Sequence, residues 1–260
     1  MPPLTLLWHD EHLVAVYKPA GWLVHRTGLD AGETRFVLQA LRDQLGQRVF
    51  PVHRLDKGTC GTLLFALHAD AARRLTQAFT EHTVEKRYLA LVRGWPPAEA
   101  EVDHALKPDD APADAAAQPA RTRFRRLARL ELPEPAPGAD PRFTTTRAAL
   151  VEAWPLTGRR HQIRRHLKHL AHPILGDATH GKGPLNRWWA ERLGQQRLWL
   201  HAAGLRLVHP FTGALLEMDT GVFAPMPGVM PTPDGRDWRE LLAAWPWDWD
   251  WDEMQDREPA

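Results

Sequence analysis

The stretch PVHRLDKGTCGTLLFAL, from Pro51 to Leu67, is the part of the chain that says most about its fold and chemistry. Its second half, GTLLFAL, is a continuous apolar run of strand length, which predicts a buried strand. Its first half holds two candidate nucleophiles, Asp56 and Cys60, and Cys60 is the single cysteine of the chain. The choice between them decides what kind of enzyme this is, if it is an enzyme.

Cys60 and Asp56 both have a structural explanation that competes with a catalytic one. A catalytic thiol needs a base, and although His53 and His68 are near in sequence, neighbouring positions along a strand do not place an imidazole on the sulfur. A small residue at a strand entrance is typical of packing. Asp56 lies between Arg54 and the turn-forming Lys57-Gly58, so a surface salt bridge explains it as well as catalysis does.

The surrounding segments alternate between strand and helix patterns. Residues 5–25 predict two short strands broken at Lys18-Pro19 and again at Ala20-Gly21, and residues 86–94 predict a further strand. A helix is expected over residues 34–46, with Thr34 as a candidate N-cap. This alternation, with no repeat, predicts a mixed α/β (α+β) fold.

A second helix is expected over residues 69–83, with Leu75, Ala78 and Phe79 on its inward face. The chain has 260 residues, and we expect a single catalytic domain over residues 1–244. Segments 108–120 and 131–142 are rich in Pro, Ala and Asp, so we expect surface loops there. Residues 245–260 form an acidic tail rich in Trp and Asp, whose acids are either solvated or compete with RNA for a basic face.

Positive charge is concentrated although the formal net charge is only +1. Segments 157–170 and 121–129 each hold five cations, which indicates a polyanion-binding face, with solvated surfaces as the alternative. In the first segment, Ile163, Leu167 and Leu170 have the spacing of one buried helix stripe. Arg160, Arg164 and Lys168 fall on another side, where they predict a cationic ridge.

Several classes of protein are excluded or disfavoured. One cysteine forms no internal disulfide and no cysteine pair is present to hold a structural zinc ion, which fits a reducing compartment. The helix spacing of His166, His169 and His172 spreads them apart, so no metal site is expected. The apolar runs are far shorter than a bilayer span and the N-terminus shows no leader, so we expect a cytoplasmic protein without a membrane partner, and a monomer.

Five segments of the chain together resemble the RluA-type pseudouridine synthase family. HRLDKGTCG (His53 to Gly61) is similar to that family's catalytic aspartate motif. The other four segments occur in the family's order, and they are KPAGWLVH (18–25), KRYLALVRG (86–94), TGRRHQIRRHLKHLAHPILGD (157–177) and LWLHAAGLRLVHPFTG (198–213). Within the family, the sequence looks most like the tRNA pseudouridine(65) synthase branch.

The resemblance assigns roles to individual residues. It implies that Asp56 is the catalytic aspartate, that Tyr88 stacks on the uracil or takes a proton from it, and that Arg164 pairs with the aspartate. Expected substrate contacts are Arg54, Leu55, Thr59, Arg160, His161 and Lys168. Cys60 replaces the family's usual serine, a nearly isosteric change, and His180 stands where many relatives carry tyrosine.

The resemblance also implies a fold and a reaction. The expected fold is a mixed, largely antiparallel sheet with flanking helices and a central catalytic cleft. The expected reaction isomerises a uridine of tRNA, at position 65, to pseudouridine without a cofactor. The alternatives are a synthase that acts on rRNA or on both RNAs, and, from another class, an RNA-binding protein without catalysis.

Overall fold

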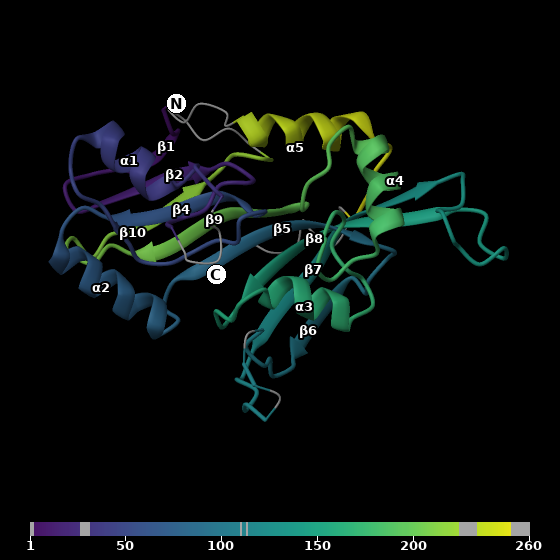
Figure 1. Cartoon of the computed structure of the whole chain (residues 1–260), viewed down its shortest axis with the longest axis horizontal. Coiled ribbons are helices and arrows are strands. Elements are labelled where there is room, and N and C mark those ends of the chain that lie inside the picture. Colours follow the sequence, from purple (N-terminus) through teal and green to yellow (C-terminus); the bar gives the residue numbers. More distant parts are fainter. Residues whose placement is uncertain (1–2, 27–31, 110, 113, 224–232, 251–260) are drawn as a thin grey trace. The chain divides into compact units, whose positions relative to one another are not determined.

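The computed structural model describes residues 3–26, 32–109, 111–112, 114–223 and 233–250. Contacts divide the chain into two compact units, each built from two separate segments (Figure 1). Unit 1 comprises Met1–Arg87 and His201–Glu240, and unit 2 comprises Tyr88–Leu200 and Leu241–Ala260. The expectation of one catalytic domain over residues 1–244 stays a prediction.

Unit 1 contains a sheet of mixed direction. Its strands are β1 (Leu6–His9), β2 (Leu13–Lys18), β4 (Cys60–Ala66), β9 (Leu200–Val208) and β10 (Leu215–Asp219), in that order, with β3 (Phe50–Pro51) paired to β4. Neighbours run antiparallel except β4 and β9, where Cys60 pairs with His201 in parallel. Every residue of β4 is buried, as its apolar run predicts.

Gly61 is required where β4 meets β9. Its φ of +112° lies in a region that side chains rarely adopt, and a Cβ atom there would collide with the backbone carbonyl of Ala202. The close approach of the two backbones therefore explains the glycine that follows Cys60 in the motif.

Helices α1 (Val37–Leu45) and α2 (Ala69–Thr80) lie beside these strands in Figure 1. In α2, Leu75 is buried, and Ala78 and Phe79 pack against the core, so the predicted inward face is confirmed. The expectation of Thr34 as the N-cap of α1 is wrong, because the cap residue is Phe36. The first helical N–H groups, of Val37 and Leu38, instead donate to the backbone carbonyls of Leu23 and Val24, at 2.9 and 3.0 Å.

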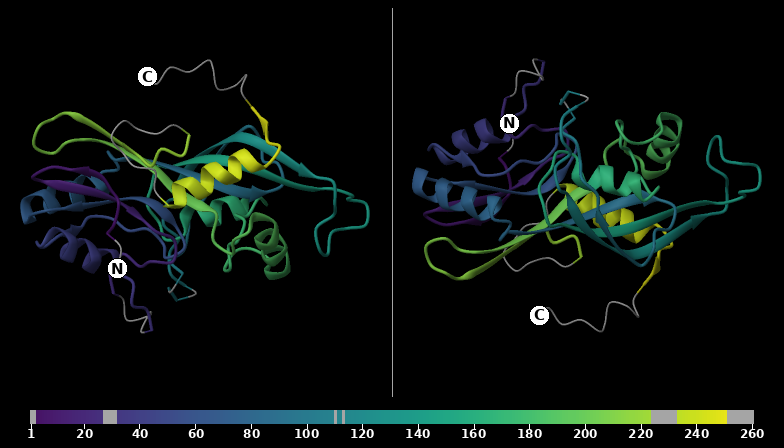
Figure 2. Two further views of the ribbon diagram at one scale, coloured as in Figure 1. Left: turned by 90° about the horizontal axis from the view of Figure 1, so that it is seen from above. Right: turned by 90° about the horizontal axis from the view of Figure 1, so that it is seen from below.

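Unit 2 contains an antiparallel sheet. Its strands are β5 (Glu85–Arg93), β8 (Thr146–Pro155), β7 (Arg121–Leu132) and β11 (Asp248–Trp249), in that order, with β6 (Glu99–Asp103) paired to β7. Helix α3 (Gln162–His169) packs on β7 and β8, as the view from below in Figure 2 shows. Unit 2 also contains α4 (Gly183–Leu193), whereas α5 (Pro233–Ala244) belongs to unit 1 as far as Glu240.

The strands of the two units confirm the predicted mixed, largely antiparallel α+β fold. The described residues of 104–120, between β6 and β7, lie outside the helices and strands, as do residues 133–145 between β7 and β8. The start of the predicted loop 131–142 is wrong, because Glu131 and Leu132 are the last residues of β7 and pair with β8. Within the described ranges, no helix is long and apolar enough to cross a membrane. Of the tail, residues 245–250 are described, and residues 251–260 lie outside the described part.

Candidate functional site

Asp56 lies on a tight turn between β3 and β4 in unit 1. The N–H of Thr59 donates to the carbonyl of Asp56 at 3.1 Å, which closes a turn around Lys57-Gly58. Leu55 and Thr59 are buried on either side of the turn, while the Asp56 side chain is half-buried and Arg54 is exposed. The turn therefore fixes the carboxylate between two anchored neighbours.

Lys18 is hydrogen-bonded to the backbone of this turn. Its side chain is fully buried, and its ammonium donates to the carbonyls of Thr59 at 2.6 Å, Lys57 at 3.2 Å and Pro19 at 3.1 Å. The N–H of Gly21 also donates to the Lys57 carbonyl, at 2.8 Å. Because the Lys57 and Thr59 carbonyls follow Asp56 in the same turn, Lys18 ties the Lys-Pro segment to the backbone on which Asp56 lies.

His53 anchors the start of the turn as a neutral imidazole. Its Nε2 accepts the N–H of Leu64 at 2.9 Å, and its ring stacks on Phe79 at 4.5 Å between centroids. Burial, together with the nearby charge of Lys86, lowers the pKa of His53 to about 3. Burial also lowers the pKa of Lys86, to about 8. His53 therefore serves as a fixed hydrogen-bond acceptor.

Cys60 does contact an imidazole, although neither His53 nor His68 supplies it. The partner is His201, whose Nδ1 lies 3.1 Å from Sγ, and whose Nε2 lies 2.7 Å from Oγ1 of Thr220. Because the Thr220 hydroxyl donates to the Ala203 carbonyl, it accepts from Nε2–H, and Nδ1 is left to accept the thiol proton. Cys60 and His201 both have no exposed surface. The thiol is therefore a hydrogen-bond donor packed in the core.

Arg164, on α3 of unit 2, is buried in a bidentate ion pair with Asp177. Its Nε and Nη2 donate to Asp177 Oδ2 and Oδ1 at 2.8 and 2.9 Å. The N–H groups of Thr179 and His180 also donate to Asp177, each at 2.9 Å. The resemblance did not single out Asp177, although its acid falls within the arginine motif.

Electrostatics keep Asp177 ionised. Burial alone would raise the pKa of Asp177, but the hydrogen bonds and charge of Arg164 and the N–H of His180 outweigh it and hold the pKa below its ordinary value. Gly176 precedes it with a φ of +75°, and a Cβ atom there would collide with the Arg197 carbonyl, so a glycine is needed to bring Asp177 into place.

His180 lies beside this pair as a neutral side chain. Burial lowers its pKa, and the cations Arg164 and Lys168 lower it further, against the opposing effect of Asp177. Its Nε2 is buried and has no hydrogen-bond partner among the described residues. The ring lies 5.7 Å from that of His161, centroid to centroid. His180 therefore places a ring nitrogen at the position where the resemblance leads us to expect a tyrosine.

Two residues of the arginine motif anchor α3 to the sheet. The amide of Gln162 accepts from Thr157 and from the N–H of Arg159, and it donates to the Arg121 carbonyl and to Thr122. His166 contacts Thr122 Oγ1 at 2.9 Å and the His104 carbonyl at 3.0 Å, and burial lowers its pKa. No sequence pattern singles out Gln162, because a buried amide is recognised only by its partners.

The predicted cationic ridge of α3 is only partly correct. Ile163 and Leu167 are buried as expected, while Leu170, after the end of the helix, is only half-buried. Arg164 is buried as well, at 7 % exposure, because Asp177 balances its charge. Lys168 is exposed, and the Arg160 side chain is 40 % exposed. His161 begins the helix with a left-handed φ of 55°. The accessible cations are therefore Arg160 and Lys168, without a continuous row between them.

The basic segment 121–129 is not a free polyanion-binding face, which corrects that interpretation. Arg121 and Arg123 both pair with Glu101 of the neighbouring strand β6, and Arg125 pairs with the buried Glu152 of β8. Arg126 and Arg129 pair with Asp250 and Asp248 of the tail segment, whose strand β11 pairs with β7. Four acids that are distant in sequence thus pair with the five arginines, Glu101 with two of them.

The structure sorts the predicted site residues into two groups. Arg54, Leu55, Asp56 and Thr59 share one turn of unit 1. Arg160, His161, Arg164 and Lys168 lie along α3 of unit 2, and Tyr88 is a half-buried residue of β5 opposite Ala153.

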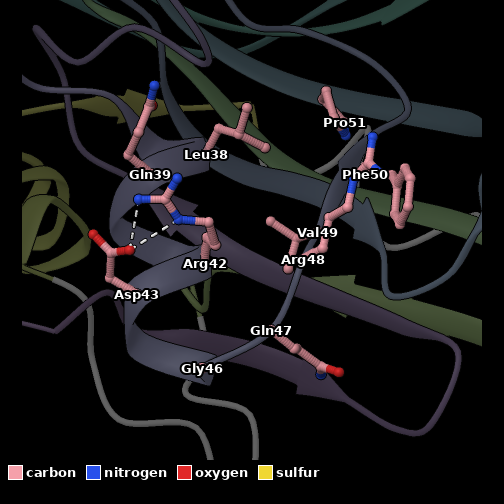
Figure 3. A pocket seen from close by; sticks show the side chains of 10 residues that line it. All are labelled: Leu38, Gln39, Arg42, Asp43, Gly46, Gln47, Arg48, Val49, Phe50 and Pro51. Carbon is pink, nitrogen blue, oxygen red and sulfur yellow. Dashed lines mark hydrogen bonds and ion pairs between the residues drawn. The ribbon is translucent and has the colours of Figure 1, made fainter.

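Figure 3 shows a pocket of unit 1 that none of these residues lines. It lies between α1 and β3, and Arg42 on its wall is paired with its neighbour Asp43 at 2.7 Å. Among the described residues, no group of three or more His, Cys, Asp or Glu side chains is placed to hold a metal ion.

Comparisons with known proteins agree with the motifs. A family model described as RNA pseudouridylate synthase matches residues 12–169. The tRNA pseudouridine synthase C of Vibrio cholerae serotype O1 is 47 % identical over 246 residues, which is 92 % of this chain and 98 % of that protein. The Salmonella typhimurium protein of the same name is 49 % identical over 226 residues, covering 84 % of this chain and 85 % of that protein.

Solved structures show the same fold. Human RNA pseudouridylate synthase domain containing 1 superposes with a TM-score of 0.68 at 23 % identity, over 100 % of both chains. Human RNA pseudouridylate synthase domain containing 4 gives a TM-score of 0.64 at 24 % identity, over 92 % of this chain and 93 % of that one.

Proposed function

Because this chain belongs to the RNA pseudouridylate synthase family, and is therefore an isomerase, we propose that it converts one uridine of tRNA to pseudouridine. The support for tRNA is that curated relatives 47–49 % identical over most of the chain are named tRNA pseudouridine synthase C. The motif details favour the uridine at position 65. A cytoplasmic, monomeric enzyme is part of the same proposal, and the lone buried cysteine fits a reducing compartment.

The reaction rearranges a nucleoside without adding or removing atoms. The N1–C1′ glycosidic bond breaks, the uracil rotates, a C5–C1′ bond forms, and the proton on C5 leaves while N1 gains one. No group donor or oxidant enters this balance, so we propose that the reaction needs no cofactor. Asp56 is the proposed catalytic carboxylate, which either attacks C1′ or removes the 2′ proton.

The observation that carries the proposal is that hydrogen bonds hold the backbone turn on which Asp56 lies. Its turn is closed by the Thr59 N–H, and the buried ammonium of Lys18 binds the carbonyls of Lys57 and Thr59, which follow Asp56 in the turn. A salt bridge on the surface needs no such support, because side chains there gain little from a fixed geometry. A carboxylate that must approach a ribose carbon from one direction does need it.

Arg164 and Tyr88 complete the proposed catalytic set. An arginine has five N–H donors, and the pairing with Asp177 engages two of them, so Arg164 has the capacity to pair with Asp56 as the resemblance implies. Tyr88 is proposed to stack on the uracil or to take a proton from it. Arg54 and the cations of α3 are proposed to hold the displaced nucleotide and its phosphates.

A map of pseudouridine in cells with and without this gene tests the substrate. Loss of pseudouridine at position 65 of tRNA, with rRNA unchanged, is the expected result. Loss in rRNA instead, or in both RNAs, would favour the alternative synthase. An unchanged map, together with purified protein that binds RNA without turnover, would leave the non-catalytic RNA-binding protein as the explanation.

A further inference from the structure

The loop between β6 and β7 is fixed at its base beside α3 (Figure 1). Leu106 and Gln118 exchange backbone hydrogen bonds of 2.9 and 3.0 Å across it. Arg165 Nη1 donates to the Lys107 carbonyl at 2.6 Å, and Arg159 Nε donates to the Pro119 carbonyl at 3.0 Å. The loop that the sequence suggests is only a surface insertion is therefore bound to the start of α3 on both of its sides.

From this base the loop presents one carboxylate to the cations of α3. Asp109 Oδ2 lies 2.7 Å from His161 Nδ1 and 3.5 Å from Arg160 Nε, and Asp109 Oδ1 lies 3.3 Å from Arg165 Nη1. Three basic side chains thus converge on a single acid that is itself 25 % exposed. Two of the three, Arg160 and His161, are proposed substrate contacts.

A carboxylate in this position resembles a bound phosphate. Both present oxygens that arginine and imidazole N–H groups recognise, and both carry one negative charge when the phosphate is part of an RNA backbone. The contacts are weak enough to exchange, because ion pairs that water reaches contribute little each and are screened by salt.

We propose that Asp109 occupies a phosphate site formed by Arg160, His161 and Arg165, and that a backbone phosphate of the substrate RNA displaces it. This proposal rests on the proposed function, since it assumes that RNA is the ligand. The loop carboxylate competes with every RNA, so it weakens binding to RNAs that make few other contacts. The inserted loop thereby determines how strongly an RNA must bind elsewhere before it binds at this surface.

The test compares Asp109→Asn with Asp114→Asn. Asp114 is an exposed acid of the same loop and has no ion pair among the described residues, so its change alters the net charge equally without touching the cations. Asp109→Glu is the second control, because it keeps the competing charge. Affinity for a tRNA transcript is measured by titration at salt concentrations from about 50 to about 200 mM.

Asp109→Asn is expected to tighten tRNA binding by about threefold to tenfold at the lowest salt, with the gain shrinking as salt rises. Asp114→Asn and Asp109→Glu are expected to stay within about twofold of the wild type. A weakening by Asp109→Asn would overturn the proposal, because Asp109 would then be a brace that orients the arginines for RNA. Equal tightening by Asp109→Asn and Asp114→Asn would overturn it as well, since net charge alone would explain the effect.

Turnover, measured separately as tritium release from uridine labelled at C5, distinguishes this proposal from the proposed function. A wild-type protein that binds tRNA without turnover would contradict the proposed function and leave the comparison of the Asp109 and Asp114 variants valid. Failure of every variant to bind RNA would overturn the phosphate site whatever turnover shows.

Discussion

At the scale of single residues, the contact between Cys60 and His201 distinguishes a packed thiol from a reactive one. A catalytic thiol needs a base and also access to the substrate. Cys60 has the imidazole but no exposed surface, and the hydrogen bond to Thr220 leaves His201 Nδ1 as the acceptor. The pair is therefore part of the core beneath the Asp56 turn.

Cys60→Ser is expected to keep the turnover rate within a few-fold of the wild type. A serine hydroxyl fits the same volume and donates to His201 Nδ1 in place of the thiol. Single-turnover tritium release measures the rate, and thermal unfolding shows whether the variant is folded. A loss of several orders of magnitude in a folded variant would return Cys60 to the role of nucleophile.

Lys18→Met is expected to damage both stability and catalysis. The change leaves the buried Thr59 carbonyl without its ammonium donor, which costs about 1–3 kcal/mol of unfolding free energy. The loosened turn should slow turnover by about tenfold to a hundredfold, because a small misplacement of a reacting group has effects of that order. Urea unfolding and single-turnover rates measure the two effects.

Lys57→Met is the matched control for Lys18→Met. Lys57 lies next to Asp56 in sequence, but its side chain is about half exposed and pairs with Glu33. This variant should change both quantities only slightly. Equal effects of the two substitutions would show that positive charge near Asp56, and not the hydrogen bonds of Lys18 to the turn, determines stability and turnover.

At the scale of secondary-structure elements, the Arg164–Asp177 pair joins α3 to the segment that follows it. Asp177→Asn leaves Arg164 buried beside a neutral amide, and loss of one partner of a buried ion pair costs about 3–5 kcal/mol. Asp70→Asn, which removes an exposed acid of α2 that pairs with Arg73 and Arg74, is the control and should have a small effect.

The pH dependence of stability gives a second signature of Asp177. Its folded pKa is lowered, so its contribution is fully present above the unfolded aspartate pKa and is lost as pH falls through the folded value. The difference in unfolding free energy between wild type and Asp177→Asn should therefore shrink below about pH 4. A difference that stays constant over the acid range would contradict the assignment.

The tail segment that begins at Trp245 is expected to act as a strap on the sheet of unit 2. Strand β11 pairs with β7, Trp247 is buried, and Asp250 pairs with Arg126 at 2.9 Å. Removal of residues 246–260 should lower the melting temperature, because it uncovers an edge strand and leaves Arg126 without that acid. Affinity for tRNA and its salt slope should not change; tighter binding would favour an acid that competes with RNA.

The sequence predicts the elements better than it predicts their partners. The apolar run of β4 and the inward face of α2 follow from local periodicity, and both are confirmed. The N-cap of α1 was missed because its first N–H groups are bonded to the distant carbonyls of Leu23 and Val24. Helical spacing also placed Arg164 on an exposed ridge, since spacing does not reveal a buried acid 13 residues later.

At the scale of the whole molecule, the sequence likewise shows where the charges are but not which of them pair. Arg126 and its partner Asp250 are 124 residues apart, so the arginines of β7 look unbalanced when segment 121–129 is read alone. The family motifs, in contrast, are local, and they led to the fold and to the enzyme class. Lys18 connects two of those motifs physically, because its ammonium binds the turn that carries Asp56.

The most direct test of the catalytic role of Asp56 is single-turnover tritium release from tRNA labelled at C5 of uridine, with Asp56→Asn beside the wild type. The amide keeps the shape of the side chain but has no charge, so it neither attacks C1′ nor removes the 2′ proton. The expected loss is at least about a thousandfold in rate, or ~4 kcal/mol of barrier, with tRNA affinity preserved and with Asp70→Asn as the control. Near-normal tritium release by Asp56→Asn would contradict the assignment.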